Sequence, residues 1–243
     1  MKIDLLTLFP EFFRSPLATS MVARACSQGL VEIAVHDLRA FAQDRHRTVD
    51  DTPYGGGGGM VIKPEPVARA WEALGLAGGL CIFLTADGEP LNQRLAVQLS
   101  LAPRLVLLCG HYKGIDERIR RKYIDREISI GDYVLTGGEP AALVLLDAVV
   151  RLIPGVLGNF ASALEDSFHE ELLDCPWYTR PAVFAGEGVP EVLLSGDHQQ
   201  VRQWRRRQAL RRTFERRPEL LARAELDEEE RHLLEEWSSE KGR

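Results

Sequence analysis

The sequence predicts an α/β fold built on a parallel sheet, followed by a small helical domain toward the C-terminus. Two observations lead to this prediction. Short apolar runs alternate with helix-like segments over the first two-thirds of the chain, which is the rhythm of βαβ units. Composition then changes, and from residue 167 onward Arg- and Glu-rich segments replace the strand-like runs.

The predicted strands are apolar runs flanked by Pro, Gly or Asp, at residues 3–9, 31–35, 80–85 and 105–109. Such runs suit strands that are buried on both faces of a parallel sheet. Helical spacing of apolar residues predicts helices over 66–74, 92–101 and 140–152, the last with Pro140 in its first turn. In a sheet of this kind, ligands bind at the carboxyl ends of the strands.

The chain changes character after residue 152. Pro154 and the glycines that follow it end the preceding helix, and residues 161–166 are small and polar enough to form a mobile connection. Helical segments are then predicted over 199–214, 218–224 and 227–237. We therefore expect a second, all-helical domain.

Composition places the chain among soluble globular proteins. Its 243 residues are 45% hydrophobic and 27% charged, and no apolar run approaches the ~18 residues that a membrane helix needs. The N-terminus lacks a basic segment leading into an apolar one, so we expect cytoplasmic residence. The four cysteines are scattered, which favours buried or free thiols over a disulfide framework or a zinc site.

The charge is unevenly distributed. A net charge of −6 argues weakly against nucleic-acid binding, yet nine arginines and only two glutamates lie between residues 198 and 223. Contacts with a phosphate backbone depend on such a local patch. Trp204 and Phe214 lie within it; stacking on bases and packing in a small core both fit these rings, and packing is the commoner role.

Glycine-rich turns are the strongest functional signal. Two of them occupy residues 109–118 and 130–139, and glycine lets a main chain approach a flat ligand closely. Ordinary strand-to-helix turns explain them equally well. Five further glycines at 55–59 are followed by Met60, so they form neither a P-loop nor a G-x-G-x-x-G turn. They fit a surface loop or, beside the charged run 44–51, a contact with a phosphate-bearing polymer.

Taken together, the motifs resemble the bacterial tRNA (guanine-N1)-methyltransferases, the TrmD-type members of the SPOUT methyltransferases. The resemblance spans nearly the whole chain. Its first blocks are LFPE (8–11), RHRTVDD (45–51), PYGGG (53–57), CG (109–110) and IGDYVLTGGE (130–139). Later blocks are RLIPGVLG (151–158), EDSF (165–168), LDCPWYTRP (173–181) and LLSGDH (193–198).

The resemblance implies a fold, an activity and partners. The parallel sheet would carry a deep trefoil knot, an exception to the near-absence of knots. Residues 1–160 would form the knotted domain that binds S-adenosylmethionine, 161–166 a flexible linker, and 167–243 a helical tRNA-binding domain. The activity would be methylation of N1 of guanosine 37, immediately 3′ of the tRNA anticodon. The family also implies a homodimer whose active sites lie at the subunit interface, and a magnesium requirement for which no ligands are identified.

The resemblance also assigns residues. Cofactor binding falls on Leu84, Thr85, Gly88, Gly110, Tyr112, Gly114, Ile130, Gly131, Asp132, Tyr133, Val134, Leu135, Gly137 and Gly138. Contacts with tRNA fall on His46, Asp50, Ser162, Arg202 and Arg205.

The chemistry of the reaction gives two further residues their roles. Guanine N1 carries a proton, so methylation needs a general base and a cation near O6. Asp166 matches the family's base and Arg151 its cation. By themselves, the residues also fit a linker or N-cap carboxylate and an arginine at a helix end.

Some positions depart from the family pattern, notably Ala86, Asp87 and Lys113. These departures change the side-chain contacts expected around the cofactor, but a pocket formed mainly by main-chain groups is less affected.

Two rival functions remain: a knotted methyltransferase for another RNA position, and a non-catalytic RNA-binding protein that uses the basic helices alone.

Overall fold

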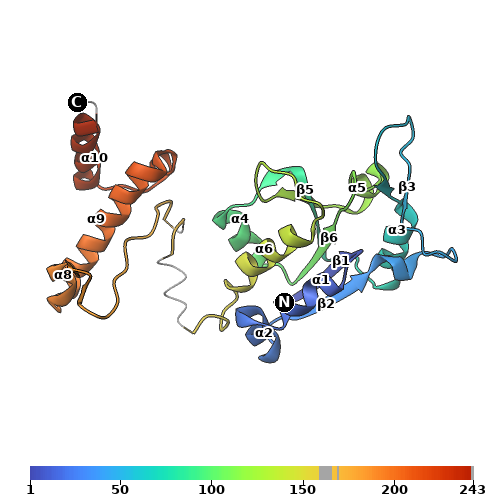
Figure 1. Ribbon diagram of the computed structural model, residues 1–243, viewed down its shortest axis with the longest axis horizontal. Coiled ribbons are helices and arrows are strands. Elements are labelled where there is room, and N and C mark those ends of the chain that lie inside the picture. The colour runs from blue at the N-terminus through green and yellow to red at the C-terminus, as the bar shows by residue number, and fades with distance from the viewer. Residues whose placement is uncertain (159–165, 169, 242–243) are drawn as a thin grey trace. The chain divides into compact units, whose positions relative to one another are not determined.

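The computed structural model describes residues 1–158, 166–168 and 170–241. The chain forms two compact units, Met1–Phe160 and Ala161–Arg243. Figure 1 shows the ribbon of both units, coloured from blue at the N-terminus to red at the C-terminus. None of the helices in the described part of the chain combines the length and apolar character that a membrane crossing requires.

The first unit is built on a five-stranded parallel sheet with the strand order β2-β1-β6-β5-β7. Its strands are β1 (Lys2–Thr7), β2 (Glu32–Asp37), β5 (Leu80–Pro90), β6 (Arg104–Cys109) and β7 (Arg126–Ser129). The four predicted strands and the parallel sheet are confirmed, with ends shifted by a few residues. The sequence analysis missed β7, because this strand is four residues long and begins with two charged residues.

Both faces of the sheet are buried, as the continuous apolar runs predicted. Side chains of β6 alternate between the two cores: Leu105 and Leu107 pack in one, and Val106 and Leu108 pack in the other. Asp4 of β1 is the notable polar side chain in this interior. It accepts hydrogen bonds from His36 and Arg104, each over 2.8 Å, so its buried carboxylate is satisfied.

Helices cover the two faces. On one side α6 (Glu139–Val150) contacts α1 (Glu11–Leu17), α2 (Ser20–Ser27) and α4 (Gln93–Ser100). Elsewhere α3 (Pro64–Ala73) contacts α5 (Glu117–Tyr123) and the 3₁₀ helix Leu38–Phe41. A small antiparallel pair, β3 (Asp50–Asp51) and β4 (Val61–Ile62), completes the unit. The helices predicted at 66–74, 92–101 and 140–152 are confirmed as α3, α4 and α6.

Helix α6 begins where the sequence indicated. Gly138 is its N-cap residue, and Pro140 lies in the first turn, where its missing N–H costs no hydrogen bond. Glu139 is buried and accepts a 2.7 Å hydrogen bond from the Thr7 hydroxyl. The start of α6 is thereby tied to the end of β1, beside the glycine turn 137–138.

The second unit contains α8 (Glu191–Leu194), α9 (His198–Arg216), the 3₁₀ helix Pro218–Ala222 and α10 (Glu228–Lys241). Its core is formed by Leu172, Leu210 and Trp237, with Phe214 packed against them. The helices predicted at 199–214, 218–224 and 227–237 are confirmed. Asp197 is the N-cap residue of α9, and its carboxylate accepts hydrogen bonds from two main-chain N–H groups, as expected at this position.

The prediction of an all-helical C-terminal domain was wrong in one detail. A hairpin of β8 (Val183–Phe184) and β9 (Glu187–Gly188) lies before α8. Its two turn residues, Ala185 and Gly186, both have positive φ, the conformation that matches the twist of a two-residue hairpin. Strands of two residues are too short to show alternation in a sequence.

Candidate functional site

A cavity of about 340 Å³ opens in the first unit, next to the carboxyl ends of β6 and β7. On the β5 side the wall includes Leu84, after which the pairing of β5 with β7 shifts register. Three chain segments, 110–114, 128–131 and 133–138, form most of the remaining wall. This is the edge at which open parallel sheets bind their ligands.

Two glycines allow the walls of this cavity to meet. The N–H of Gly138 donates a 2.8 Å hydrogen bond to the carbonyl of Gly110. A Cβ on Gly138 would lie 2.9 Å from the Cα of Cys109, and one on Gly110 would lie 2.7 Å from the ring of Phe83. Both positions therefore need glycine for close main-chain and ring packing.

Most of the predicted cofactor residues lie around this cavity. They are Leu84, Thr85, Gly110, Tyr112, Gly114, Ile130, Gly131, Tyr133, Val134, Leu135, Gly137 and Gly138. Gly88 and Asp132 are not among the lining residues. A Cβ on Gly88 would approach the main chain of Glu127 and Ile128 to 2.5 Å, so this glycine lets β5 lie against β7. Asp132 is exposed to solvent.

A second cavity, of about 300 Å³, lies within the second unit and contains Asp166 in its wall. Side chains of α9 form one part of the wall and segment 170–177 the other. The lining residues are Asp166, Glu170, Leu172, Leu173, Asp174, Cys175, Trp177, Arg202, Arg205, Arg206 and Ala209. Asp166, Arg202 and Arg205, which the sequence assigned to catalysis and tRNA binding, are thus brought to one cavity.

Arg151, the other catalytic candidate, follows α6 as its C-cap residue, and its N–H donates to the carbonyl of Asp147 over 3.3 Å. Arg151 belongs to the first unit and Asp166 to the second. The surroundings of each residue are therefore those of its own unit.

Comparison with known proteins assigns the chain to a family. Residues 1–223 match the family described as tRNA (Guanine-1)-methyltransferase TrmD. The chain belongs to this family. Curated relatives named tRNA (guanine-N(1)-)-methyltransferase support the assignment. The relative from Chloroflexus aggregans is 54% identical over 98% of this chain and 95% of its own length. The relative from Moorella thermoacetica is 53% identical over 100% of this chain and 98% of its own length. The relative from Geobacillus kaustophilus is 51% identical over 99% of this chain and 100% of its own length.

Several lining residues of the first cavity were not predicted for this TrmD family member. They are Phe83, His111, Lys113, Ile128, Ser129, Thr136 and Ala141. His111 and Lys113 lie inside the glycine turn that the sequence singled out, so extending the assignment to the whole turn would have found them. The ring of His111 lies 5.0 Å from that of Phe9 and 4.9 Å from that of Tyr112. Its Nδ1 is buried without a hydrogen-bond partner among the described residues.

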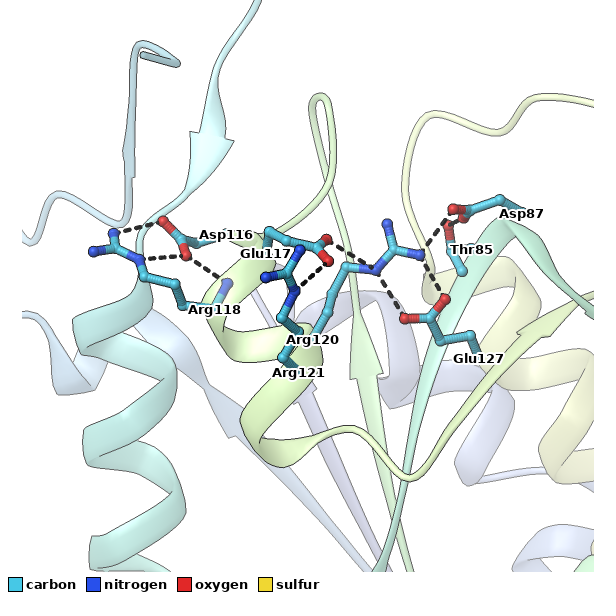
Figure 2. A network of polar contacts seen from close by, with 8 residues as sticks. All are labelled: Thr85, Asp87, Asp116, Glu117, Arg118, Arg120, Arg121 and Glu127. Carbon is cyan, nitrogen blue, oxygen red and sulfur yellow. Dashed lines mark hydrogen bonds and ion pairs between the residues drawn. The ribbon is translucent and has the colours of Figure 1, made fainter.

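Asp87, one of the departures from the family pattern, is held outside the first cavity by a polar network (Figure 2). Arg120 of α5 donates to Asp87 over 2.8 Å and to both carboxylate oxygens of Glu127. Thr85 also donates to Asp87. The Thr85 hydroxyl and the Arg120 guanidinium hold the pKa of Asp87 below its ordinary value. The guanidinium also lies 5.6 Å from the ring centre of Phe83, which lines the cavity.

His46, one of the tRNA-binding candidates of the first unit, lies on a turn that Asp44 closes. The Asp44 carboxylate accepts hydrogen bonds from the N–H of His46 and from the N–H and hydroxyl of Thr48. His46 is exposed, whereas Asp50 is half-buried in β3. Ser162 lies outside the described residues.

Part of the arginine-rich region takes part in ion pairs within the second unit. Three of its arginines form ion pairs within the second unit: Arg206 with Glu230 and Glu170, Arg211 with Glu215, and Arg217 with Glu219. In contrast, Arg202 is exposed and forms no ion pair within 4.0 Å among the residues that the structure describes. The positive patch available to a phosphate backbone is therefore smaller than the sequence count suggested.

The four cysteines are free thiols, and Cys81, Cys109 and Cys175 are buried. Burial raises the pKa of the Cys175 thiol to about 11. Burial, together with the carboxylate of Glu139, raises the pKa of Cys109. No three His, Cys, Asp or Glu side chains within the described ranges are grouped so as to hold a metal ion.

Proposed function

We propose that this protein transfers the methyl group of S-adenosylmethionine to N1 of guanosine 37 of tRNA, immediately 3′ of the anticodon. Membership of the family makes the chain a tRNA (guanine-N1)-methyltransferase. The observation that supports the cofactor is the first cavity. Its volume falls in the range of roughly 300–1,000 Å³ that is typical of small-molecule sites.

The lining of the first cavity suits this cofactor. Leu84, Ile130 and Leu135 offer apolar contacts for an adenine ring, and the glycine turns expose main-chain groups for its polar atoms. The buried Nδ1 of His111, which has no partner among the described residues, is available to a polar group of a ligand. When bound, S-adenosylmethionine supplies a methyl group on a sulfonium that needs no acid in order to leave.

In the proposed mechanism, two side chains act on the guanine. Asp166 accepts the proton of N1, so that the nitrogen lone pair becomes available for the methyl group. Arg151 neutralises the negative charge that develops on O6 as the proton leaves. Arg202 and Arg205, with His46, Asp50 and Ser162, contact the tRNA, mainly through charge that positions the backbone.

We further propose the architecture that the family implies. The parallel sheet of the first unit carries a deep trefoil knot around the cofactor. Residues 1–160 form the methyltransferase domain, 161–166 the linker and 167–243 the tRNA-binding domain. The protein acts in the cytoplasm as a homodimer with each active site at the subunit interface, and it uses Mg²⁺.

The test is methyl transfer from labelled S-adenosylmethionine to two unmodified tRNA transcripts that differ only in guanosine or adenosine at position 37. We expect label in the guanosine transcript alone, mapped to N1. Label at another position would assign a different RNA target. Cofactor binding in a titration distinguishes an enzyme from a non-catalytic RNA-binding protein, which would show neither label nor cofactor binding.

A further inference from the structure

Trp177 is an exposed aromatic side chain that is held in one orientation. The residue is 56% exposed. Its indole N–H donates a 2.5 Å hydrogen bond to the Asp174 carboxylate. The guanidinium of Arg205 lies 4.3 Å from the ring centre, within the range of a cation–π contact. The ring is thus fixed at one edge and on one face while much of its surface stays open to solvent.

Trp177 and Arg205 together separate two cavities. Both residues line the cavity that contains Asp166 and also a neighbouring cavity of about 480 Å³. The lining of the neighbouring cavity includes Tyr178, Arg180 and Leu193. The Trp177–Arg205 pair is therefore a partition with a site on each side.

The chemistry of the two cavities favours RNA bases. Single-stranded RNA is recognised by stacking of unpaired bases on aromatic rings and on Arg guanidinium planes, and the partition offers both. On one side, the carboxylate of Asp166 matches the N1–H and N2–H donors of guanine. On the other side, Tyr178 and Arg180 offer a second ring and a second guanidinium.

We propose that the Trp177–Arg205 pair is a wedge between two adjacent nucleotides of the tRNA. The acceptor guanine occupies the side of Asp166, and the base next to it in the chain occupies the side of Tyr178 and Arg180. This inference rests on the proposed function for the identity of the first base. The wedge itself rests on the geometry of Trp177 and Arg205.

The main test compares tRNA dissociation constants, which do not depend on turnover. Trp177→Ala should weaken tRNA binding by roughly 10- to 100-fold, the range expected for one base–aromatic stack, and should leave S-adenosylmethionine affinity unchanged. Trp177→Phe keeps a ring and should stay nearer the wild type. Phe184→Ala is the matched control, because Phe184 is 75% exposed in the same unit but lines neither cavity.

A double-mutant cycle identifies the base. Transcripts with an abasic nucleotide on the 5′ or the 3′ side of the acceptor are bound to wild type and to Trp177→Ala. If the wedge is correct, one of the two abasic transcripts binds the wild type more weakly than the intact transcript does. The Trp177→Ala change then lowers the affinity for that abasic transcript no further, because the two changes remove the same contact. Additive losses at both positions would overturn the proposal. A wild type that shows this coupling but methylates no guanosine would retain the wedge and refute the proposed function.

A contact between copies of the chain is the competing role for the ring. Sedimentation of wild type and Trp177→Ala at equal concentrations distinguishes it. Equal masses with weaker tRNA binding support the wedge. A change of mass in the variant, with tRNA affinity per assembled molecule unchanged, would refute it and assign Trp177 to self-association.

Discussion

The two cavities of this protein are built in different ways. The cavity at the carboxyl ends of β6 and β7 is formed largely by glycine turns and apolar side chains. The cavity around Asp166 combines apolar side chains such as Leu172, Leu173 and Trp177 with three carboxylates and three arginines. The shape of the first therefore depends on how closely main chains approach, and the chemistry of the second depends on the identity of its side chains.

This difference explains why the departures from the family pattern have different consequences. Asp87 does not line the first cavity, and its carboxylate accepts hydrogen bonds from Arg120 and Thr85. Ala86 and Lys113 line the cavity, but the position of its walls depends on the strand ends and on the glycines. A cavity of this kind tolerates changes of side chain better than added atoms at its glycines.

The largest effect is expected from Asp166→Asn, which tests whether side-chain identity controls the second cavity. The variant keeps the shape but removes the base, so methyl transfer should fall by about 10²- to 10⁴-fold. Cofactor affinity should not change. Single-turnover transfer to guanosine-37 tRNA and a cofactor titration measure the two quantities.

Glu170→Gln is the matched control for Asp166→Asn, because Glu170 lines the same cavity and pairs with Arg206. We expect it to retain most of the activity. Near-normal turnover of Asp166→Asn would remove Asp166 from the role of base.

Arg151→Ala should lower turnover more than cofactor affinity.

Gly138→Ala tests the first cavity and should have the next largest effect. The new methyl group would lie 2.9 Å from the Cα of Cys109 and 3.0 Å from the N of Gly110. Main-chain atoms cannot rotate away, so we expect a loss of about 1–3 kcal/mol in the free energy of unfolding, as for other overpacked sites. Cofactor affinity should also fall. Chemical denaturation and cofactor titration are the measurements.

Gly58→Ala provides the control for Gly138→Ala. A Cβ at Gly58 meets nothing within 4 Å, and its φ is not in the left-handed region. This variant should keep the stability and cofactor affinity of the wild type. If Gly138→Ala behaved in the same way, the close approach of the two turns would not control the cavity.

The contrast also shows what the sequence is able to predict. The strands and the first cavity follow from local patterns: apolar runs at 80–85 and 105–109, and glycines at 110 and 137–138. Because parallel strands end at one edge of a sheet, residues far apart in the chain were placed together correctly. Gly88 shows the limit of such patterns, since a glycine that admits a ligand and one that admits a neighbouring strand look alike in a sequence.

The second cavity was less predictable because its interactions join distant residues. Arg206 pairs with Glu230 and Glu170, and Trp177 is held by Arg205. No local pattern distinguishes these arginines from Arg202, which forms no ion pair among the described residues. Charge counting found the basic region but could not assign its members to folding or to binding.

Arg120→Ala should have a moderate effect and tests whether side chains also support the first cavity from outside. Arg120 is 24% exposed and bridges Glu127 and Asp87 beside Phe83. Its loss leaves these carboxylates without their cation, so we expect about 1–3 kcal/mol of destabilisation and several-fold weaker cofactor binding. Arg121→Ala removes only an exposed pair with Glu117 and should be close to neutral. Equal behaviour of the two variants would contradict a positioning role for Arg120.

Asp87→Asn should have the smallest effect, and the size of the effect depends on pH. The hydrogen bond from Thr85 and the pairing with Arg120 lower the pKa of Asp87 below its ordinary value of 3.8. A lowered folded-state pKa means that the ionised carboxylate stabilises the fold above the unfolded-state pKa, and that this stabilisation is lost as the pH falls. Because Asp87 is 62% exposed, its contribution should not exceed about 1 kcal/mol. The difference in unfolding free energy between wild type and variant should therefore be constant near neutral pH and should shrink below pH 3.8. A difference that persists unchanged in acid would show that the contribution of Asp87 does not come from its ionised carboxylate.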